Sequence, residues 1–176
     1  MIFDFLLNSA KEFPTKTALI FENSQINYFD LNQKALCLAR TLKKNKPYVV
    51  SLLLSNSIDF CISFFGILYS GNICHVIPTS ISDSNLSNQL KLTNPSIILS
   101  NSIFQKKLLR INTTEKYSFL DITKFDFKHN STLDSEFDTS NDSSLIALIL
   151  FSAGTTSVPK AVQLSHNNIE NTVNRV

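Results

Sequence analysis

A run of small, mostly hydroxylated residues near the carboxyl end of the chain has the composition of an anion-binding loop. The run, which is followed by Pro159 and Lys160, consists of Ser152, Ala153, Gly154, Thr155, Thr156 and Ser157. Small residues let backbone N–H groups converge on an anion, and hydroxyl groups add further donors. Lys160 adds a positive charge, and each hydrogen bond to a charged phosphate contributes about 1.5–3 kcal/mol. The pattern therefore favours a phosphate-binding loop.

Apolar residues on both sides predict that this loop connects two strands. Leu145–Phe151 is continuously apolar, which is typical of a short strand buried on both faces, and Ala161–Leu164 is a shorter apolar run. A tight polar hairpin that binds nothing has the same composition, so it stays open on the residues alone. A nucleotide P-loop is excluded, because the second glycine is missing before Lys160 and Ala161-Val162 follows it.

The stretch resembles the phosphate-binding signature of the adenylate-forming superfamily, which includes acyl-CoA synthetases, luciferases and the adenylation domains of peptide synthetases. That signature reads Tyr/Phe-Thr/Ser-Ser-Gly-Thr/Ser-Thr-Gly-x-Pro-Lys-Gly-Val and is commonly followed by Leu-Ser-His. In this chain the order and spacing are unbroken, and the sequence reads Phe151-Ser152-Ala153-Gly154-Thr155-Thr156-Ser157-Val158-Pro159-Lys160-Ala161-Val162, then Leu164-Ser165-His166. The match is specific enough to raise the phosphate-loop interpretation above the plain hairpin.

Three positions depart from the signature. Ala153 lacks the hydroxyl of the usual Ser, and Ser157 and Ala161 replace glycines. A Ser at 157 costs about 1–2 kcal/mol where the backbone needs a positive φ. The resemblance implies that Ser152, Ala153, Gly154, Thr155, Thr156, Ser157 and Lys160 bind ATP with Mg²⁺. It also implies that a carboxylic acid becomes an acyl-adenylate and passes to a thiol of CoA or a carrier protein. No catalytic residue or metal ligand is assigned.

The same resemblance extends upstream. The family opens with Pro, then Thr-Ala-Leu, then Tyr-x-Glu/Asp-Leu, and the counterparts here are Pro14, Thr17-Ala18-Leu19 and Tyr28-Phe29-Asp30-Leu31. Two later stretches, Val50–Ser57 and Gly66–Gly71, also match. The resemblance is weaker between residue 100 and the loop. All 176 residues are therefore interpreted as the N-terminal portion of an AMP-binding (adenylation) domain.

Family motifs that follow the loop, including those for adenine, ribose, metal and the catalytic Lys, lie outside these 176 residues. The chain is therefore not expected to be active alone. It is interpreted as a truncated gene product, a split subunit or a fragment, with a second chain carrying the rest of the domain as one expected partner. The alternative is a non-catalytic remnant or partner-binding module of the same fold.

The elements that would hold the loop alternate along the chain. Besides the loop strand, strands are expected at Tyr48–Leu54, Ile73–Ile77, Ser96–Leu99 and Tyr117–Leu120. Helices are expected before Pro14 and at Asp30–Lys44, Ile58–Ser70 and Ile103–Ile111, and Asp83 or Ser84 is expected to cap a further helix that runs to about Thr93. A hairpin of Ala18–Phe21 and Gln25–Tyr28 lies near the start. This order predicts an α/β fold, a layered parallel-sheet subdomain with flanking helices, which is the N-terminal portion of the adenylate-forming enzyme fold.

Composition narrows the function classes. The net charge is +2 and the lysines are scattered, so no nucleic-acid partner is expected. The most apolar region, Tyr48–Ile77, is broken by Asn56, Asp59 and Gly71, so no membrane span is expected. The amino-terminal segment has no signal-peptide pattern, and a cytoplasmic location is expected.

Three further groups of residues could carry chemistry. Cys37, Cys61 and Cys74 lack metal-ligand spacing and are interpreted as reduced, buried thiols. The acidic residues between Phe125 and Asp142 fit no calcium loop and are interpreted as a solvated linker. His166 could be catalytic, but with Ser165 as an N-cap it is better interpreted as the start of a helix.

Overall fold

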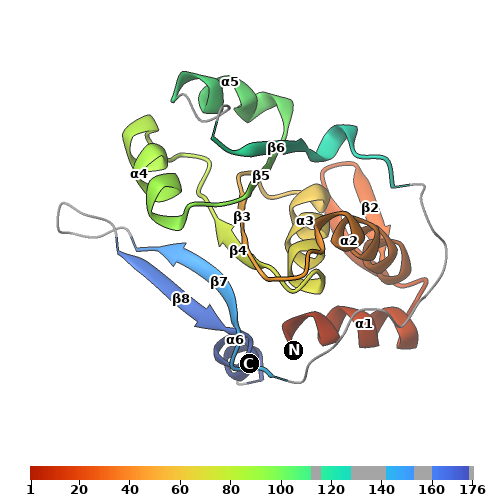
Figure 1. Ribbon diagram of the computed structural model, residues 1–176. Helices are drawn as coiled ribbons and strands as arrows, with labels where there is room; N and C mark the ends of the chain where they lie inside the picture. The colour runs from red at the N-terminus through yellow and green to blue at the C-terminus, as the bar shows by residue number, and fades with distance from the viewer. Residues whose placement is uncertain (112–115, 128–141, 153–159, 175–176) are drawn as a thin grey trace.

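The computed structural model describes residues 1–111, 116–127, 142–152 and 160–174. Its helices are α1 (Ile2–Glu12), α2 (Tyr28–Leu42), α3 (Ile58–Tyr69), α4 (Asp83–Thr93), α5 (Ser102–Arg110) and α6 (His166–Val173), with one 3₁₀ turn, η1 (Ile122–Lys124). Its strands are β1 (Thr17–Phe21), β2 (Ser24–Asn27), β3 (Val49–Leu52), β4 (Ile73–Val76), β5 (Ile97–Ser100), β6 (Ser118–Asp121), β7 (Ile146–Phe151) and β8 (Ala161–Ser165). Figure 1 shows their arrangement.

A six-stranded sheet forms the centre of the fold, in the order β6-β5-β3-β4-β7-β8. The first five strands in this order run parallel, and β8 alone is antiparallel to its neighbour, β7. The predicted parallel sheet is therefore confirmed, as are the strand before the loop and the strand after it. The predicted amino-terminal hairpin is also confirmed, as the separate two-stranded sheet of β1 and β2.

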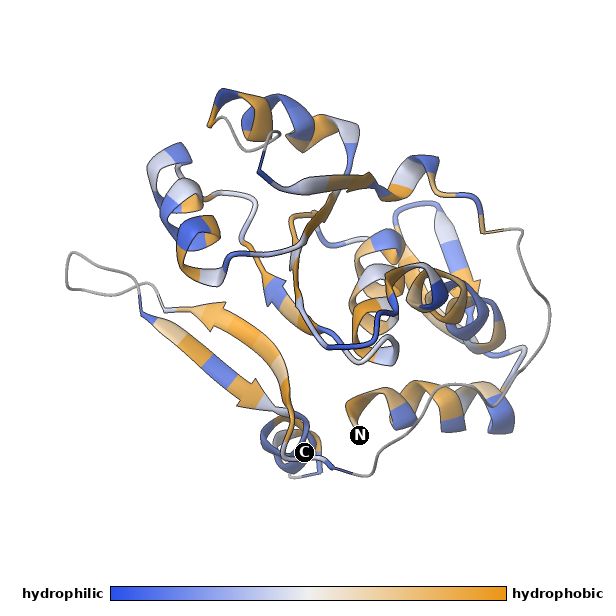
Figure 2. Ribbon diagram, viewed as in Figure 1, coloured by the Kyte–Doolittle hydropathy of each residue, from blue (hydrophilic) through white to orange (hydrophobic). Residues whose placement is uncertain are grey.

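Helices cover both faces of the sheet. On one face, α3 packs against β3 and β4, and α2 and α1 pack against α3, so that the three helices share one core with alternate strand residues such as Val50, Leu52 and Cys74. On the other face, α4 and α5 pack on the intervening positions, including Leu53 and Ile98. This alternation follows from the two-residue period of a strand. In the hydropathy view the central strands are largely apolar, whereas apolar and polar residues alternate along the helices (Figure 2).

Side-chain caps fix where two helices begin, and both differ from the sequence expectation. The expected cap of α4 was Asp83 or Ser84, but Ser82 is the cap and accepts a hydrogen bond from the Asn85 N–H. Asp83 instead lies in the first turn, where its negative charge interacts favourably with the positive end of the helix dipole. Helix α2 begins at Tyr28 rather than Asp30, because Asn27 accepts the Asp30 N–H at 2.7 Å.

Helices α2 and α3 approach each other closely at Gly66. A Cβ atom built on Gly66 would lie 2.9 Å from Leu38 Cδ2 and 3.1 Å from the carbonyl oxygen of Ala35. Real Cβ atoms do not tolerate the shorter distance, so the two helices must separate or Leu38 must move. Only a glycine therefore fits this crossing as it stands.

We predict that Gly66→Ala lowers the free energy of unfolding by about 1–3 kcal/mol, the usual effect of overpacking a core. Urea unfolding followed by circular dichroism measures the loss. The double variant Gly66→Ala/Leu38→Ala serves as the control, because it removes Leu38 Cδ2, the nearest of the atoms that the new methyl group meets. The two substitutions should therefore be less damaging together than the sum of their separate effects. Strict additivity would show that the helices do not meet at this point.

The remaining sequence expectations concern thiols, metals and membranes. Cys37, Cys61 and Cys74 are free cysteines, and Cys37 and Cys74 are buried as expected, whereas Cys61 is half-buried. Within residues 1–111, 116–127, 142–152 and 160–174, no group of three or more His, Cys, Asp or Glu residues could hold a metal ion. None of the helices described here is long and apolar enough to cross a bilayer. Most of the acidic segment before Asp142 lies outside the described residues.

Candidate functional site

The β7–β8 hairpin carries the candidate phosphate loop. Its register pairs Leu148 with Leu164 and Phe151 with Ala161. One residue further, the Ser152 N–H donates to the carbonyl oxygen of Lys160 at 3.1 Å. This bond closes the base of the loop and holds its two ends together. The strand, loop and strand order predicted from the sequence is therefore confirmed at both ends.

The structure describes two of the seven predicted binding residues, Ser152 and Lys160. Both are exposed, and they lie together at the loop end of the hairpin. The other five lie outside the described residues and are Ala153, Gly154, Thr155, Thr156 and Ser157. A hydroxyl and an ammonium group at the two ends of one loop form a donor set that suits an anion.

The predicted burial of the loop strand was wrong for one of its faces. Ala147 and Ile149 are buried, but Ile146 and Leu150 are 37% and 36% exposed. The cause is topological, because β7 is next to the edge of the sheet and β8 is the edge strand. Val162, which pairs with Leu150 across the hairpin, is exposed as well. An apolar run by itself does not show that helices cover both faces.

His75 forms a buried polar cluster directly beside the hairpin, and sequence reasoning missed it. Its Nδ1 lies 2.8 Å from Ser51 Oγ and 3.3 Å from Thr93 Oγ1, and its Nε2 lies 3.4 Å from Gln89 Oε1. The ring also packs against Phe151, with the two centroids 5.3 Å apart. Burial lowers the pKa of His75 to about 4, and the hydrogen bond with Gln89 opposes that shift only in part. The imidazole is therefore neutral at neutral pH.

His166 begins α6, as expected, and Ser165 caps that helix by accepting the Asn168 N–H. The His166 side chain is buried and meets the Phe3 ring edge-on at 5.7 Å. Burial is the main cause of its lowered pKa, and the nearby amino-terminal charge adds to it. His166 follows the end of β8 that pairs with Ile146, which is the end of the hairpin opposite to Ser152 and Lys160. This position favours a structural role.

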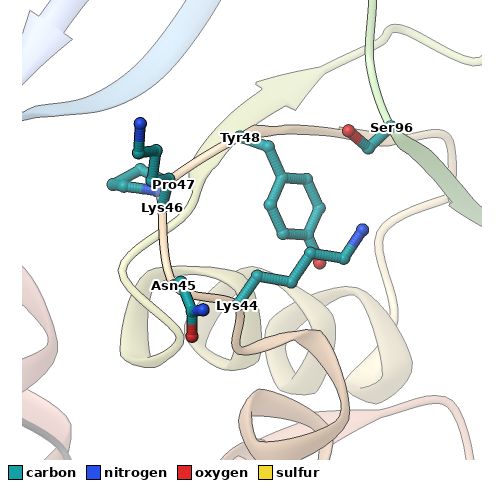
Figure 3. A pocket seen from close by; sticks show the side chains of 6 residues that line it. All are labelled: Lys44, Asn45, Lys46, Pro47, Tyr48 and Ser96. Atoms are coloured by element: carbon teal, nitrogen blue, oxygen red, sulfur yellow. The ribbon is translucent and has the colours of Figure 1, made fainter.

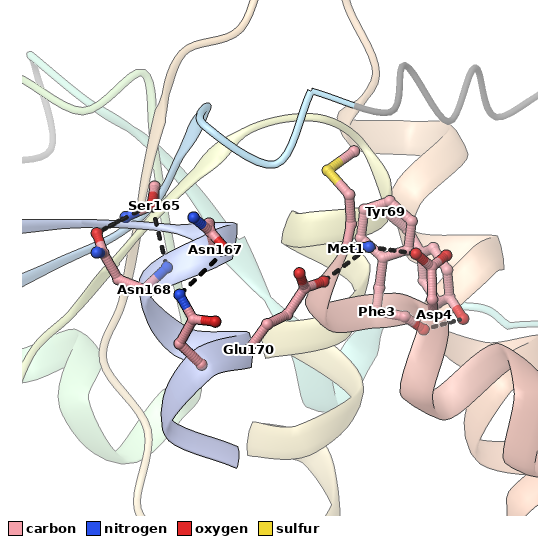
Figure 4. A network of polar contacts seen from close by, with 9 residues as sticks. Met1, Phe3, Asp4, Tyr69, Ser165, Asn167, Asn168 and Glu170 are labelled. Carbon is pink, nitrogen blue, oxygen red and sulfur yellow. Dashed lines mark hydrogen bonds and ion pairs between the residues drawn. The ribbon is translucent and has the colours of Figure 1, made fainter. Parts of the chain in front are cut away.

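A network of polar contacts ties α6 to α1 (Figure 4). The amino group of Met1 contacts Asp4 and forms an ion pair with Glu170 at 2.8 Å. Burial works against the charge of this amine, but its hydrogen bonds to the two carboxylates prevail and raise its pKa. The Tyr69 hydroxyl donates to Asn32 Oδ1 at 2.6 Å and lies 3.3 Å from the Phe3 carbonyl oxygen, so it joins α3 to α2 and to the same helix, α1. The base of the hairpin is therefore anchored to the amino-terminal helix.

Two hollows lie at opposite ends of the parallel strands. One, of about 460 Å³, lies where β3 and β4 end and is lined by Leu54, Ser55, Asn56, Phe60, Val76, Ile77, Pro78, Thr79 and Ser80. Parallel sheets commonly bind ligands at the carboxyl ends of their strands. The loop leaves β7 at the same end, because β7 runs parallel to β4. The other, of about 610 Å³, lies before β3 and is lined by Lys44, Asn45, Lys46, Pro47, Tyr48 and Ser96 (Figure 3). Its lysines lie away from the loop.

The chain combines a parallel α/β sheet with a hairpin that has Ser152 and Lys160 of the signature at the two ends of its loop. The sequence profile of the AMP-binding enzyme family matches residues 6–176. The chain therefore belongs to the AMP-binding enzyme family, and its sheet and helices are those of the adenylate-forming N-terminal domain.

Two curated relatives and one solved structure illustrate the match. The chain is 24% identical over 165 residues to tyrocidine synthase 1 of Brevibacillus parabrevis, with 92% of this chain and 15% of the relative covered. It is 26% identical over 205 residues to the long-chain-fatty-acid–CoA ligase of Bacillus subtilis, with 93% and 36% covered. A fatty acyl-adenylate ligase from Legionella pneumophila, solved with acyl adenylate and pyrophosphate, has a TM-score of 0.78 at 22% identity over 99% of this chain and 32% of that one. The chain thus spans well under half the length of each of these three proteins.

Proposed function

We propose that this chain is the N-terminal portion of an AMP-forming carboxylate ligase and that it contributes the loop that binds the phosphates of ATP. The observation that carries the proposal is the closed base of the loop between β7 and β8, where the Ser152 N–H donates to the Lys160 carbonyl oxygen. The signature residues occupy the loop between these two ends. Membership of the AMP-binding enzyme family supports the same nucleotide.

The donors of the loop suit the phosphates rather than a metal ion. Ser152, Thr155, Thr156 and Ser157 carry hydroxyls, and Lys160 carries the positive charge. Mg²⁺ would therefore arrive bound to ATP, where it neutralises phosphate charge, and the loop would hold and orient the β- and γ-phosphates. The carboxylic acid would attack the α-phosphorus, pyrophosphate would leave, and the acyl group would pass to a thiol of CoA or a carrier protein.

The rest of an adenylation domain, which the longer relatives carry, would complete the ligase, and the whole would work in the cytoplasm. One observation favours a second role, a non-catalytic remnant or partner-binding module of the same fold. Ala153, Ser157 and Ala161 replace a hydroxyl residue and two glycines of the signature. Loss of a hydroxyl at residue 153 and of a glycine at residue 157 would weaken phosphate contacts that catalysis requires.

We predict that Lys160→Ala weakens the binding of tripolyphosphate roughly ten- to a hundredfold, since one charge-assisted contact contributes about 1.5–3 kcal/mol. Isothermal titration calorimetry at low ionic strength measures both affinities. Lys46→Ala is the matched control, because Lys46 is also exposed but lies at the opposite edge of the sheet. Equal affinities for the wild type and Lys160→Ala would refute the proposal and favour the remnant.

A further inference from the structure

His75 occupies a central place in the sheet beside the candidate loop. It lies on β4, where its backbone is paired with Ser51 on β3 and with Ile149 on β7. Its side chain is fully buried, at 0% exposure, on the face that α4 covers. Most neighbouring core positions are apolar, so a histidine here requires partners for both ring nitrogens.

The contacts around the ring fix its tautomer and its orientation. Gln89 Oε1 can only accept, so the Nε2 that faces it carries the hydrogen. Nδ1 is then an acceptor, and it takes the hydroxyl hydrogen of Ser51 at 2.8 Å. The Thr93 hydroxyl donates its hydrogen to the backbone carbonyl oxygen of Gln89 at 2.8 Å, so it does not compete with Ser51 as the donor to Nδ1. With both nitrogens engaged by different elements, the plane of the ring is held.

The held ring contacts the last residue of β7. The His75 and Phe151 rings lie 5.3 Å apart between centroids at an interplanar angle of 59°. Phe151 immediately precedes Ser152, whose N–H closes the loop base on Lys160. Phe151 therefore connects the held His75 ring to the residue that closes the loop base.

From these contacts we propose that His75 is a positioning residue for the phosphate loop. It acts through Phe151, and the polar contacts with Ser51 and Gln89 hold its ring in place. The expected effect of His75 on phosphate affinity rests on the proposed function. Its effect on the Ser152–Lys160 hydrogen bond is independent of any ligand.

Two substitutions at His75 separate positioning from stability. His75→Gln keeps polar groups near Ser51 and Gln89 but removes the ring. His75→Phe keeps a ring against Phe151 but leaves those polar groups without a nitrogen partner. We expect His75→Phe to have the lower urea midpoint, because buried polar groups lose their partners. We expect His75→Gln to have the faster hydrogen exchange at the Ser152 amide, by about two- to tenfold, the fold-change that corresponds to one aromatic contact.

A second route reaches the same contact if His75→Phe does not fold. Phe151→Leu removes the ring from the other side and should accelerate Ser152 exchange by a similar factor. Added to His75→Gln, it should bring little further change, since the contact is already lost. Leu31→Ala on α2 is the control, because it lowers stability through the core on the other face without touching either ring.

Phosphate affinity provides the last readout. His75→Gln should weaken tripolyphosphate binding about two- to tenfold, and Leu31→Ala should leave it unchanged. The inference is overturned if Ser152 exchange is unaltered in His75→Gln, or if it follows the urea midpoint across all variants. A wild type that binds no tripolyphosphate overturns the proposed function instead, and the exchange measurements still decide the role of His75.

Discussion

Acidification from pH 7 to pH 4.5 should lower the free energy of unfolding by about 2–3 kcal/mol through His75 alone. Burial lowers the pKa of His75 to about 4 in the folded chain, against 6.5 for the exposed side chain. Its contacts in the structure are hydroxyl, amide and aromatic groups, so no neighbouring carboxylate among them compensates a charge on the ring. Unfolding releases the ring to water, where it takes up a proton readily.

The sign follows from the two pKa values. Between about pH 6.5 and pH 4 the unfolded chain binds one proton more than the folded chain, so stability falls as the pH falls through this window. Urea unfolding at several pH values measures the slope. His75→Gln removes this titration but leaves that of His166, whose pKa is also lowered, so the difference between the two slopes isolates His75. Parallel slopes for the two proteins would show that His75 is not buried as a neutral ring.

Restoring the signature in the loop should strengthen phosphate binding about five- to thirtyfold in the double variant Ala153→Ser/Ser157→Gly. The larger part is expected from residue 157, because a glycine adopts a positive φ without the roughly 1–2 kcal/mol that a Ser incurs. Ala153→Ser adds a hydroxyl donor. Calorimetric titration with tripolyphosphate measures the gain.

The two single variants show which residue matters. Ser157→Gly should account for most of the gain, and Ala153→Ser for a smaller part. Ala161→Gly is a useful comparison, because Ala161 lies in β8, paired with Phe151, where a positive φ is not required. An unchanged or weaker affinity in Ser157→Gly would show that the loop does not adopt the backbone conformation of the resembled signature.

The alternating elements could be predicted from sequence because each strand is short and apolar and each helix has a recognisable end. The Tyr48–Leu54 and Ile73–Ile77 runs became β3 and β4, and Ser57 and Ser165 cap α3 and α6. The start of α4 was less certain from sequence, because Ser82, Asp83 and Ser84 can each cap a helix. Only the backbone direction before the helix selects Ser82.

The features that sequence missed depend on contacts between distant residues. In the sequence His75 is marked only by its neighbour Cys74. Its partners Ser51, Gln89 and Thr93 come from β3 and α4, which are distant in the sequence. The exposed face of Leu150 likewise depends on which strand lies at the edge of the sheet. The loop was predictable for the opposite reason, because its chemistry lies in consecutive residues.

The most direct test of phosphate binding is to map ATP onto the chain by amide chemical shifts in two-dimensional NMR. If the loop binds the phosphates, the largest shifts on addition of Mg-ATP will fall between Ser152 and Lys160, and Lys160→Ala will remove them. Tripolyphosphate should shift the same amides, since the contacts are with phosphate. Shifts centred on the lysines of the pocket in Figure 3, with Ser152 and Lys160 unmoved, would contradict the assignment of the loop.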